Sequence, residues 1–265
     1  MKIQKVLNAL AIMISALFIL SCEKGIDNFI YKGKMLTIMV SGYNASDEEL
    51  ELKIDTFRSK IISTANSTIN YYNAYTFLED KKEIKLTITE KSSGKILTEK
   101  TLNKDSAPPN ISMFYSNGIV SEYPKKPAVE EGKIQLRYLY RPKTTFYQGP
   151  VDIVFVKYYF TPKVFEEFAR LKNVKPNEIS DLITFPTMNL QGLTYNGQKT
   201  AVLFKAYLFK AGTNEFITNG TENNWHLSNS SVPVPSAKDA SSKFYIFSDY
   251  IANNNNIMFT KNLEL

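Results

Sequence analysis

Two side chains that could do covalent or acid–base chemistry occur once each in this sequence, Cys22 and His226. A single cysteine cannot form a disulfide within the chain, and one cysteine with one histidine is too few for a zinc site built from several such ligands. A serine or cysteine nucleophile would need His226 as its base, and no G-x-S-x-G, P-loop or G-x-G-x-x-G motif is present. We therefore expect no catalytic residue, no metal and no cofactor.

The position of Cys22 indicates a role other than catalysis. Lys2 and Lys5 make the amino terminus positive, and residues 6–20 are apolar except for two polar side chains. As a helix this apolar stretch would rise only roughly 22 Å, less than the hydrocarbon core of a bilayer, which is about 30 Å thick. A short positive start followed by such a stretch is typical of a secretory signal peptide, here residues 1–21.

The end of that segment, Ile19-Leu20-Ser21-Cys22, resembles a bacterial lipobox. The resemblance implies cleavage between Ser21 and Cys22, a diacylglycerol on the thiol, and acylation of the new amino terminus with a fatty acid such as palmitate. Several acyl chains anchor a protein firmly, so the lipid bilayer becomes a partner and the outer membrane of the cell envelope the expected location. The chain also has far more lysine than arginine, and with the lipobox it is similar to lipoproteins of the Bacteroidota.

The distribution of charge in the mature chain argues against nucleic-acid binding. Removal of residues 1–21 takes away Lys2 and Lys5 and leaves 30 basic side chains against 26 acidic ones. The basic residues are dispersed, whereas nucleic-acid binding requires lysine and arginine clustered along the phosphates. Four neighbouring acids offer oxygen ligands for calcium but lack the spacing of an EF-hand, so a calcium site stays an open alternative. These acids are Asp47, Glu48, Glu49 and Glu51.

The first half of the mature chain has the signature of β-strands. Apolar and polar residues alternate through 50–55 and again through 84–89, as expected for half-buried strands. The turn Lys91-Ser-Ser-Gly94 joins the second of these runs to the next strand, which predicts a hairpin. Residues 64–77 leave two alternatives open, a strand or an irregular aromatic crossing.

The second half repeats this pattern with insertions. Residues 151–160 and 201–209 are apolar on both faces, which is typical of central strands. Residues 161–185 are expected to form a helical insertion, because Thr161 can cap a helix, Pro162 suits its first turn, and four apolar residues share one helical face. The four residues are Val164, Phe165, Phe168 and Leu171.

The strand starts of the two halves follow one order, which predicts a degenerate tandem repeat. The expected divisions are a tether at 22–34, a first domain at 35–123, a linker at 124–132 and a second domain at 133–265. The paired strand starts are Leu36, Leu50, Ile84, Ile96 and Ile111 with Ile134, Val151, Val202, Phe216 and Phe244.

The first half also resembles an uncharacterised immunoglobulin-like repeat of bacterial envelope proteins. The resemblance covers about ninety residues and is carried by residues 36–46, by Leu50-Glu-Leu-Lys-Ile-Asp55 and by the hairpin at 82–102. The histidine and proline usual at the first turn, and the glycine after the aspartate, are absent. The resemblance implies an all-β fold of two antiparallel immunoglobulin-like β-sandwiches in tandem, the second with the helical insertion. The family has no established activity.

Aromatic residues of the second half are the remaining candidates for a binding site. Trp225, Tyr138 and Tyr140 are expected as possible stacking platforms for a ligand, although most aromatic rings in such folds fill cores. We expect a non-catalytic binding or assembly module of the cell envelope. The alternatives are a surface glycan-binding accessory protein of a polysaccharide uptake system and a fimbrial or adhesin-type structural subunit.

Overall fold

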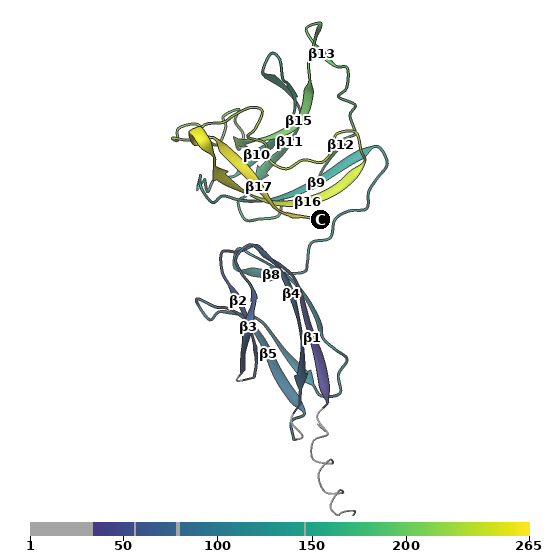
Figure 1. Cartoon of the computed structure of the whole chain (residues 1–265), viewed down its shortest axis with the longest axis vertical. Helices are drawn as coiled ribbons and strands as arrows, with labels where there is room; N and C mark the ends of the chain where they lie inside the picture. Colours follow the sequence, from purple (N-terminus) through teal and green to yellow (C-terminus); the bar gives the residue numbers. More distant parts are fainter. Residues whose placement is uncertain (1–33, 56, 78–79, 146) are drawn as a thin grey trace, which may run out of the picture.

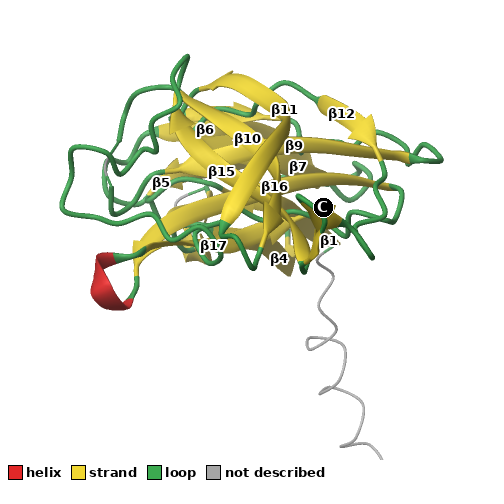
Figure 2. Ribbon diagram, turned by 90° about the horizontal axis from the view of Figure 1, so that it is seen from above, coloured by secondary structure: helices red, strands yellow, loops and turns green. Residues whose placement is uncertain are grey.

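The computed structural model of the chain describes residues 34–55, 57–77, 80–145 and 147–265. Ser21 and Cys22 lie outside these residues, as does the tether up to residue 33, so cleavage and lipidation stay predictions. Across the described ranges the regular structure is β-strand, apart from one 3-10 turn, η1 (Asn253–Asn255), drawn red in Figure 2. No helix in this part of the chain has the length and apolar character needed to cross a membrane.

The first half of the described chain forms two four-stranded sheets that pack face to face (Figure 1). The alternation along each strand turns one face into a shared core, so Ile38 of one sheet and Leu52 and Ile88 of the other are fully buried. In spatial order the first sheet contains β4 (Ser67–Thr76), β1 (Met35–Asn44), β7 (Asn110–Ser116) and β8 (Ile119–Ser121). The second contains β3 (Phe57–Ser63), β2 (Leu50–Ile54), β5 (Glu83–Glu90) and β6 (Ile96–Asn103).

The second half is built from another pair of facing sheets. Tyr138 of one sheet and Phe155 of the other meet in the core between them, with ring centroids 6.2 Å apart. One sheet contains β12 (Ile183–Pro186), β9 (Lys133–Arg141), β16 (Ser241–Ile251) and β17 (Ile257–Glu264). The other contains β11 (Val164–Val174), β10 (Val151–Tyr159) and β15 (Val202–Lys210), and a small hairpin joins β13 (Thr194–Tyr195) to β14 (Gln198–Lys199).

The two halves share their strand order and pairing directions. The opening strand of each half pairs in parallel with a late strand, β1 with β7 and β9 with β16, and antiparallel with β4 or β12 on its other edge. The next strand, β2 or β10, lies between its following strand and β5 or β15. Where the first half has β6, the second has a single bridge between Phe209 and Phe216.

The stretch left open at 64–77 is resolved as strand β4, and β3 before it was not anticipated from the sequence. In β4, Ile69 is buried while Tyr72 points outward. The aromatic residues on this strand therefore belong to a regular edge strand rather than to an irregular crossing.

The expectation of a helical insertion at 161–185 is wrong, because this segment forms β11 and β12. A bulge in the pairing of β10 with β11, at Phe155 and Val156, shifts the alternation of β11. Phe165 packs on the outer face of the sheet and Phe168 on the core face, as ordinary alternation gives, and the bulge lets Leu171 face the same core as Phe168. Apolar residues three apart can therefore pack on the two faces of a strand or, across a bulge, on one face. The same spacing is expected for one face of a helix, so the sequence pattern does not distinguish the two structures.

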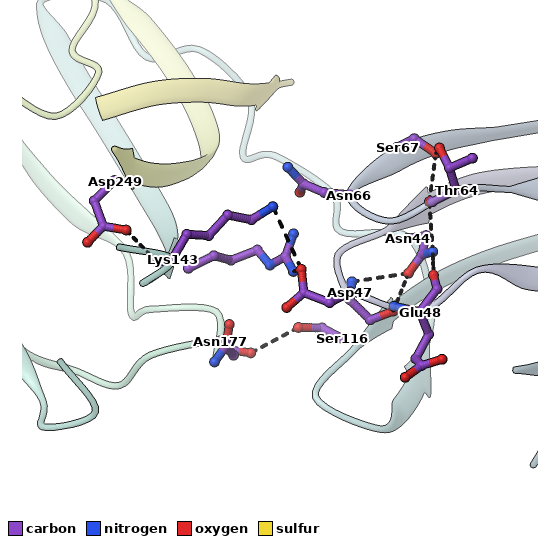
Figure 3. Close-up of polar contacts among 12 residues, drawn as sticks. Asn44, Asp47, Glu48, Thr64, Asn66, Ser67, Ser116, Lys143, Asn177 and Asp249 are labelled. Atoms are coloured by element: carbon purple, nitrogen blue, oxygen red, sulfur yellow. Dashed lines mark hydrogen bonds and ion pairs between the residues drawn. The ribbon is translucent and has the colours of Figure 1, made fainter. Parts of the chain in front are cut away.

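The two halves meet through an apolar seam with polar contacts beside it. Tyr43, Ala45 and Phe114 of the first half pack with Leu139, Phe244 and Ile246 on the outer face of the second half's first sheet. Beside this seam, Arg141 contacts Asp47 at 2.7 Å. The Ser116 hydroxyl also donates a hydrogen bond to the Asn177 carbonyl at 2.9 Å (Figure 3). The first half therefore covers a sheet face that would otherwise expose apolar side chains.

Candidate functional site

Two of the three expected stacking residues lie in the core. Tyr138 and Tyr140 are both 0% exposed, and each packs against Phe247 at ring-centroid distances of 5.8 and 5.2 Å. Their hydroxyls donate to the Pro233 carbonyl and to Asp249, and burial raises the pKa of both hydroxyls. The expectation that these two rings stack on a ligand is therefore wrong, because no ligand can reach their faces.

Trp225 lies instead at the surface of the second half, in the loop between β15 and β16. Its ring stacks on Phe216 with centroids 4.7 Å apart and planes inclined by 11°. Tyr207 meets it edge-on at 5.7 Å. Asn224, the preceding residue, is paired with the turn at Asn255 through its backbone N–H at 2.8 Å. The indole is therefore half-buried and held in place from behind.

A hollow of about 370 Å³ opens beside Trp225, and we call it the Trp225 hollow. Its walls combine aromatic and apolar side chains with a few polar ones, and Phe160 is 53% exposed. The residues that line it are Tyr158, Phe160, Lys163, Trp225, His226, Leu227 and Ser228. Such a lining suits a ligand that has an apolar face and polar edges.

One wall of the hollow comes from the turn that joins β10 to β11. The Phe160 N–H donates to the Ala201 carbonyl at 2.9 Å, and the Thr161 N–H donates to the Thr200 hydroxyl at 3.0 Å. Lys163 has a left-handed backbone, with φ of 55°, which closes the turn. Phe160 and Lys163 are thus projected from a turn that hydrogen bonds fix to the start of β15.

The opposite wall is the turn from Trp225 to Ser230. The Ser230 N–H donates to the His226 carbonyl at 2.7 Å, and the buried Ser230 hydroxyl donates to the Ile257 carbonyl at 2.6 Å. Beyond the turn, the Val232 N–H donates to the Ala206 carbonyl at 3.0 Å. The segment is therefore fastened to β15 on one side and to β17 on the other.

His226 and Ser228 lie in contact within this turn. The Ser228 hydroxyl is 3.0 Å from Nδ1 of His226 and 3.0 Å from the Asn229 side-chain oxygen. Across the described residues no carboxylate contacts the His226 ring, which is exposed. A catalytic base needs a partner that orients its ring, so the geometry suits hydrogen bonding to a ligand better than activation of a nucleophile. The absence of catalysis stays a prediction.

A larger cavity, of about 710 Å³, lies at the other end of β10 and β11, and we call it the Arg170 cavity. The Arg170 guanidinium donates to Glu167 at 2.9 and 2.7 Å, to Asp152 at 3.2 Å and to the Thr213 carbonyl at 2.8 Å. The buried Asp152 carboxylate also accepts the N–H groups of Asn173 at 2.9 Å and Gly212 at 3.1 Å. These groups satisfy one another, so this cavity is a structural joint between strand ends.

The acids considered for calcium do not converge. Asp47 contacts Arg141, Glu49 contacts Lys91 at 2.6 Å, and Glu51 contacts Lys53 at 3.5 Å. Within the ranges that the structure describes, no group of three or more histidine, cysteine, aspartate or glutamate side chains is placed to hold a metal ion.

Of the three residues expected to stack on a ligand only Trp225 lines the hollow, and the sequence did not single out Phe160, Lys163 or Ser228. These residues lie on two turns more than 60 positions apart in the chain. The one available signal was Phe160 itself, an aromatic residue between the apolar run of β10 and the Thr161-Pro162 turn. Because residues 161–185 were expected to form a helix, Phe160 was not considered as part of a surface turn.

No family model matches this chain, and no curated protein matches it. Among solved structures, it is similar to a proposed adhesin from Bacteroides ovatus, with 6% identity, a TM-score of 0.22, and coverage of 86% of this chain and 92% of the other. It is also similar to a structure of α-glucan recognition by family 41 carbohydrate-binding modules from streptococcal virulence factors, with 11% identity, a TM-score of 0.21, and coverage of 84% and 96%. A leucine-rich repeat protein from Bacteroides thetaiotaomicron VPI-5482 has 10% identity and a TM-score of 0.16, with coverage of 69% and 25%. TM-scores this low do not establish a common fold.

Proposed function

We propose that this chain is a lipid-anchored protein of the cell envelope, held at the outer membrane through acylated Cys22, which acts as a non-catalytic binding module. The lipobox-like residues 19–22 at the end of an apolar segment support the anchor. In the same proposal, residues 35–123 and 133–265 are two immunoglobulin-like β-sandwich domains joined by the linker 124–132. Their common strand order and pairing directions support this division.

The observation that carries the binding role is the Trp225 hollow. Its aromatic residues, Trp225 and the exposed ring of Phe160, offer apolar surface at the opening, and His226 and Ser228 offer hydrogen-bonding groups beside it. A sugar ring has the matching chemistry, because its C–H face is apolar and its edge carries hydroxyls. We infer that the ligand is a glycan, which favours the role of a glycan-binding accessory protein in polysaccharide uptake.

The glycan role is tested by titrating the mature protein, purified in detergent, with a panel of oligosaccharides. Trp225 is the only tryptophan in the chain, so its fluorescence reports on this site alone. We expect a shift in emission with at least one saccharide. A Phe160→Ala variant should require a higher concentration of that saccharide for the same shift. Unchanged emission and no heat of binding across the whole panel would exclude glycan binding at this hollow.

The anchor is tested separately by cell fractionation. Cys22→Ala removes the thiol to which the lipid would be attached, so we expect the variant to remain unprocessed or to be soluble in the periplasm. Ser15→Ala, a change within the apolar segment, is the matched control and should leave the protein in the membrane fraction. A Cys22→Ala protein that is cleaved and still sediments with membranes would contradict the lipid anchor.

A second candidate, a fimbrial or adhesin-type structural subunit, is favoured by a different surface. Met39 of β1 and Tyr72 of β4 lie directly opposite each other on the outer face of their sheet, and Tyr72 is 71% exposed. Exposed apolar pairs of this kind can mark a contact face. Self-assembly through it would give oligomers in light scattering that Tyr72→Ser dissociates, whereas a monomer at all concentrations would exclude this role.

A further inference from the structure

The lining of the Trp225 hollow contains cationic but no acidic side chains. Lys163 is at its rim, and His226 is the other group there that can carry a positive charge. Elsewhere on the chain lysines are commonly paired, as in the contacts of Lys133 with Glu130 at 2.6 Å and of Lys210 with Glu215 at 3.2 Å. The Lys163 ammonium has no hydrogen-bond or ion-pair partner among the residues described, so its charge is available to a ligand.

A second lysine lies on the same face of the sheet, close to the hollow. Lys205 of β15 is directly opposite Val156 of β10, and Leu203, two residues earlier, is opposite Tyr158, which lines the hollow. Lys205 is therefore the diagonal neighbour of Tyr158, within reach of a long side chain. The turn segment passes next to it, because the N–H of Ala206 donates to the Ser231 hydroxyl at 3.1 Å.

The Lys205 ammonium also lacks a partner in the described part of the chain. Val156 of β10 is paired with Lys205 on one side and with Glu167 of β11 on the other, so Val156 separates the two charged residues. Both carboxylate oxygens of Glu167 instead accept hydrogen bonds from Arg170, at 2.9 and 2.7 Å. Lys205 is half-buried, and burial lowers the pKa of its ammonium. An unpaired, partly desolvated cation is unfavourable alone, and an anion brought next to it would recover part of that cost.

We propose that the Trp225 hollow binds a carboxylate-bearing sugar, with the sugar ring against Trp225 and Phe160 and the carboxylate attracted by Lys163 and Lys205. This inference rests on the glycan role proposed above and specifies the class of glycan. The volume of about 370 Å³ is at the small end of the range for ligand pockets, so one acidic residue of a longer glycan is the fitting unit. Uronic acids and sialic acids share this chemistry.

The test compares acidic saccharides with matched neutral ones, on the full mature protein in detergent. The pairs are trigalacturonate with its methyl ester, and sialyllactose with lactose. Calorimetry measures affinity, and the emission of Trp225 places the ligand at the hollow. We expect the acidic member of at least one pair to bind roughly 10-fold or more tightly than its neutral partner, and added salt to weaken only the acidic member.

Two lysine variants test whether Lys163 and Lys205 are the cations that attract the carboxylate. Lys163→Asn removes the ammonium in a residue type that tolerates the left-handed backbone at this position. Lys205→Met removes the other ammonium and keeps an unbranched apolar side chain. Each should weaken the acidic ligand several-fold and leave the neutral one unchanged. Lys172→Gln, in the Arg170 cavity, is the matched control and should change neither.

The outcomes separate this inference from the proposal on which it depends. Equal or tighter binding of the neutral partners, still dependent on Phe160, would overturn the acidic specificity and leave the glycan role intact. Acidic binding that survives both Lys163→Asn and Lys205→Met would likewise overturn it. No binding by either member of any pair would overturn the acidic specificity, and the absence of binding across the wider oligosaccharide panel as well would remove the glycan role itself.

Discussion

The two cavities of the second half lie at opposite ends of the sheet formed by β11, β10 and β15, and they differ in how their polar groups are used. The Arg170 cavity is larger, at about 710 Å³ against about 370 Å³ for the Trp225 hollow. The Arg170 guanidinium and the buried Asp152 carboxylate in this cavity are nevertheless hydrogen-bonded to each other and to neighbouring backbone groups. The ammonium groups of Lys163, in the lining of the Trp225 hollow, and of Lys205, close to it, have no hydrogen-bond or ion-pair partner among the described residues. The availability of polar groups, rather than volume, therefore identifies the better candidate for binding.

Among the variants that test this comparison, Asp152→Ala should cause the largest change, a loss in the free energy of unfolding. It leaves the N–H groups of Asn173 and Gly212 without their acceptor and removes one partner of Arg170. Removal of one partner from a buried pair typically costs about 3 kcal/mol or more. We expect a loss of that size in the free energy of unfolding, measured in urea.

Asp152→Asn is the control for that experiment, because it keeps an acceptor oxygen at this position. It should cost less than the alanine variant, and ligand binding at the Trp225 hollow should survive in the folded fraction. A loss below about 1 kcal/mol for Asp152→Ala would show that the Arg170 cavity is not the structural joint that its contacts indicate.

Phe160→Ala should have the opposite outcome, with little change in stability and a clear loss of glycan binding. Because Phe160 is 53% exposed, removal of its ring should change the free energy of unfolding by no more than about 0.5 kcal/mol. Its removal from the ligand platform should weaken glycan binding by roughly 10-fold. Equal effects on stability and binding, measured by urea unfolding and calorimetry, would remove the distinction between the two regions.

The smallest effect concerns pH and a paired carboxylate remote from the hollow. Hydrogen bonds from Lys243, at 2.6 Å, and from Lys261 hold the pKa of Glu264 below its usual value of 4.5. Because the folded pKa is depressed, this stabilisation is present above the unfolded pKa and is lost as the pH falls through the folded pKa. The unfolding free energy should therefore decline below about pH 4.5, with up to about 1 kcal/mol due to this group.

Glu264→Gln should remove that part of the acid dependence, as measured by urea unfolding between neutral and acidic pH. The wild-type protein and the variant should then converge at low pH. Parallel curves at all pH values would contradict the assignment, because they would show that Glu264 has the same pKa in the folded and unfolded chains.

Strands with alternating apolar and polar residues were predictable because alternation is a local pattern, whereas the Trp225 hollow is built from distant segments and was not predictable. Alternation at 50–55 and 84–89 identified β2 and β5, since each has one face in the core. Tyr138 and Tyr140 lie on the core face of β9, against Phe247. They were misjudged because the opposite face is buried too, by the contact of Leu139 with the first half, so no polar alternation marks which side of the strand is the core. That contact depends on packing between residues almost a hundred positions apart, which periodicity does not report.

The helical error had a similar origin in pairing between strands. A bulge at Phe168, opposite Phe155, put Phe168 and Leu171 on the same face of β11, and a single sequence does not reveal such a bulge. The Trp225 hollow likewise requires the turns at 160–163 and 225–228 to lie side by side. Only the register of β10 with β15, and the fastening of the later turn to β15, bring them together.

The parallel pairing of β1 with β7 has a mechanical consequence. In Figure 1, β1 begins at the end of the first half farthest from the second and runs towards the second half, and β7 pairs with it in parallel and so runs in the same direction. Tension between a held amino terminus and a ligand bound by the second half would pull these neighbours in opposite directions along their length. Their hydrogen bonds would then be sheared together rather than opened one after another, so the first half would resist extension as a unit. The proposed anchor at Cys22, together with a ligand bound by the second half, would require that kind of resistance of the first half.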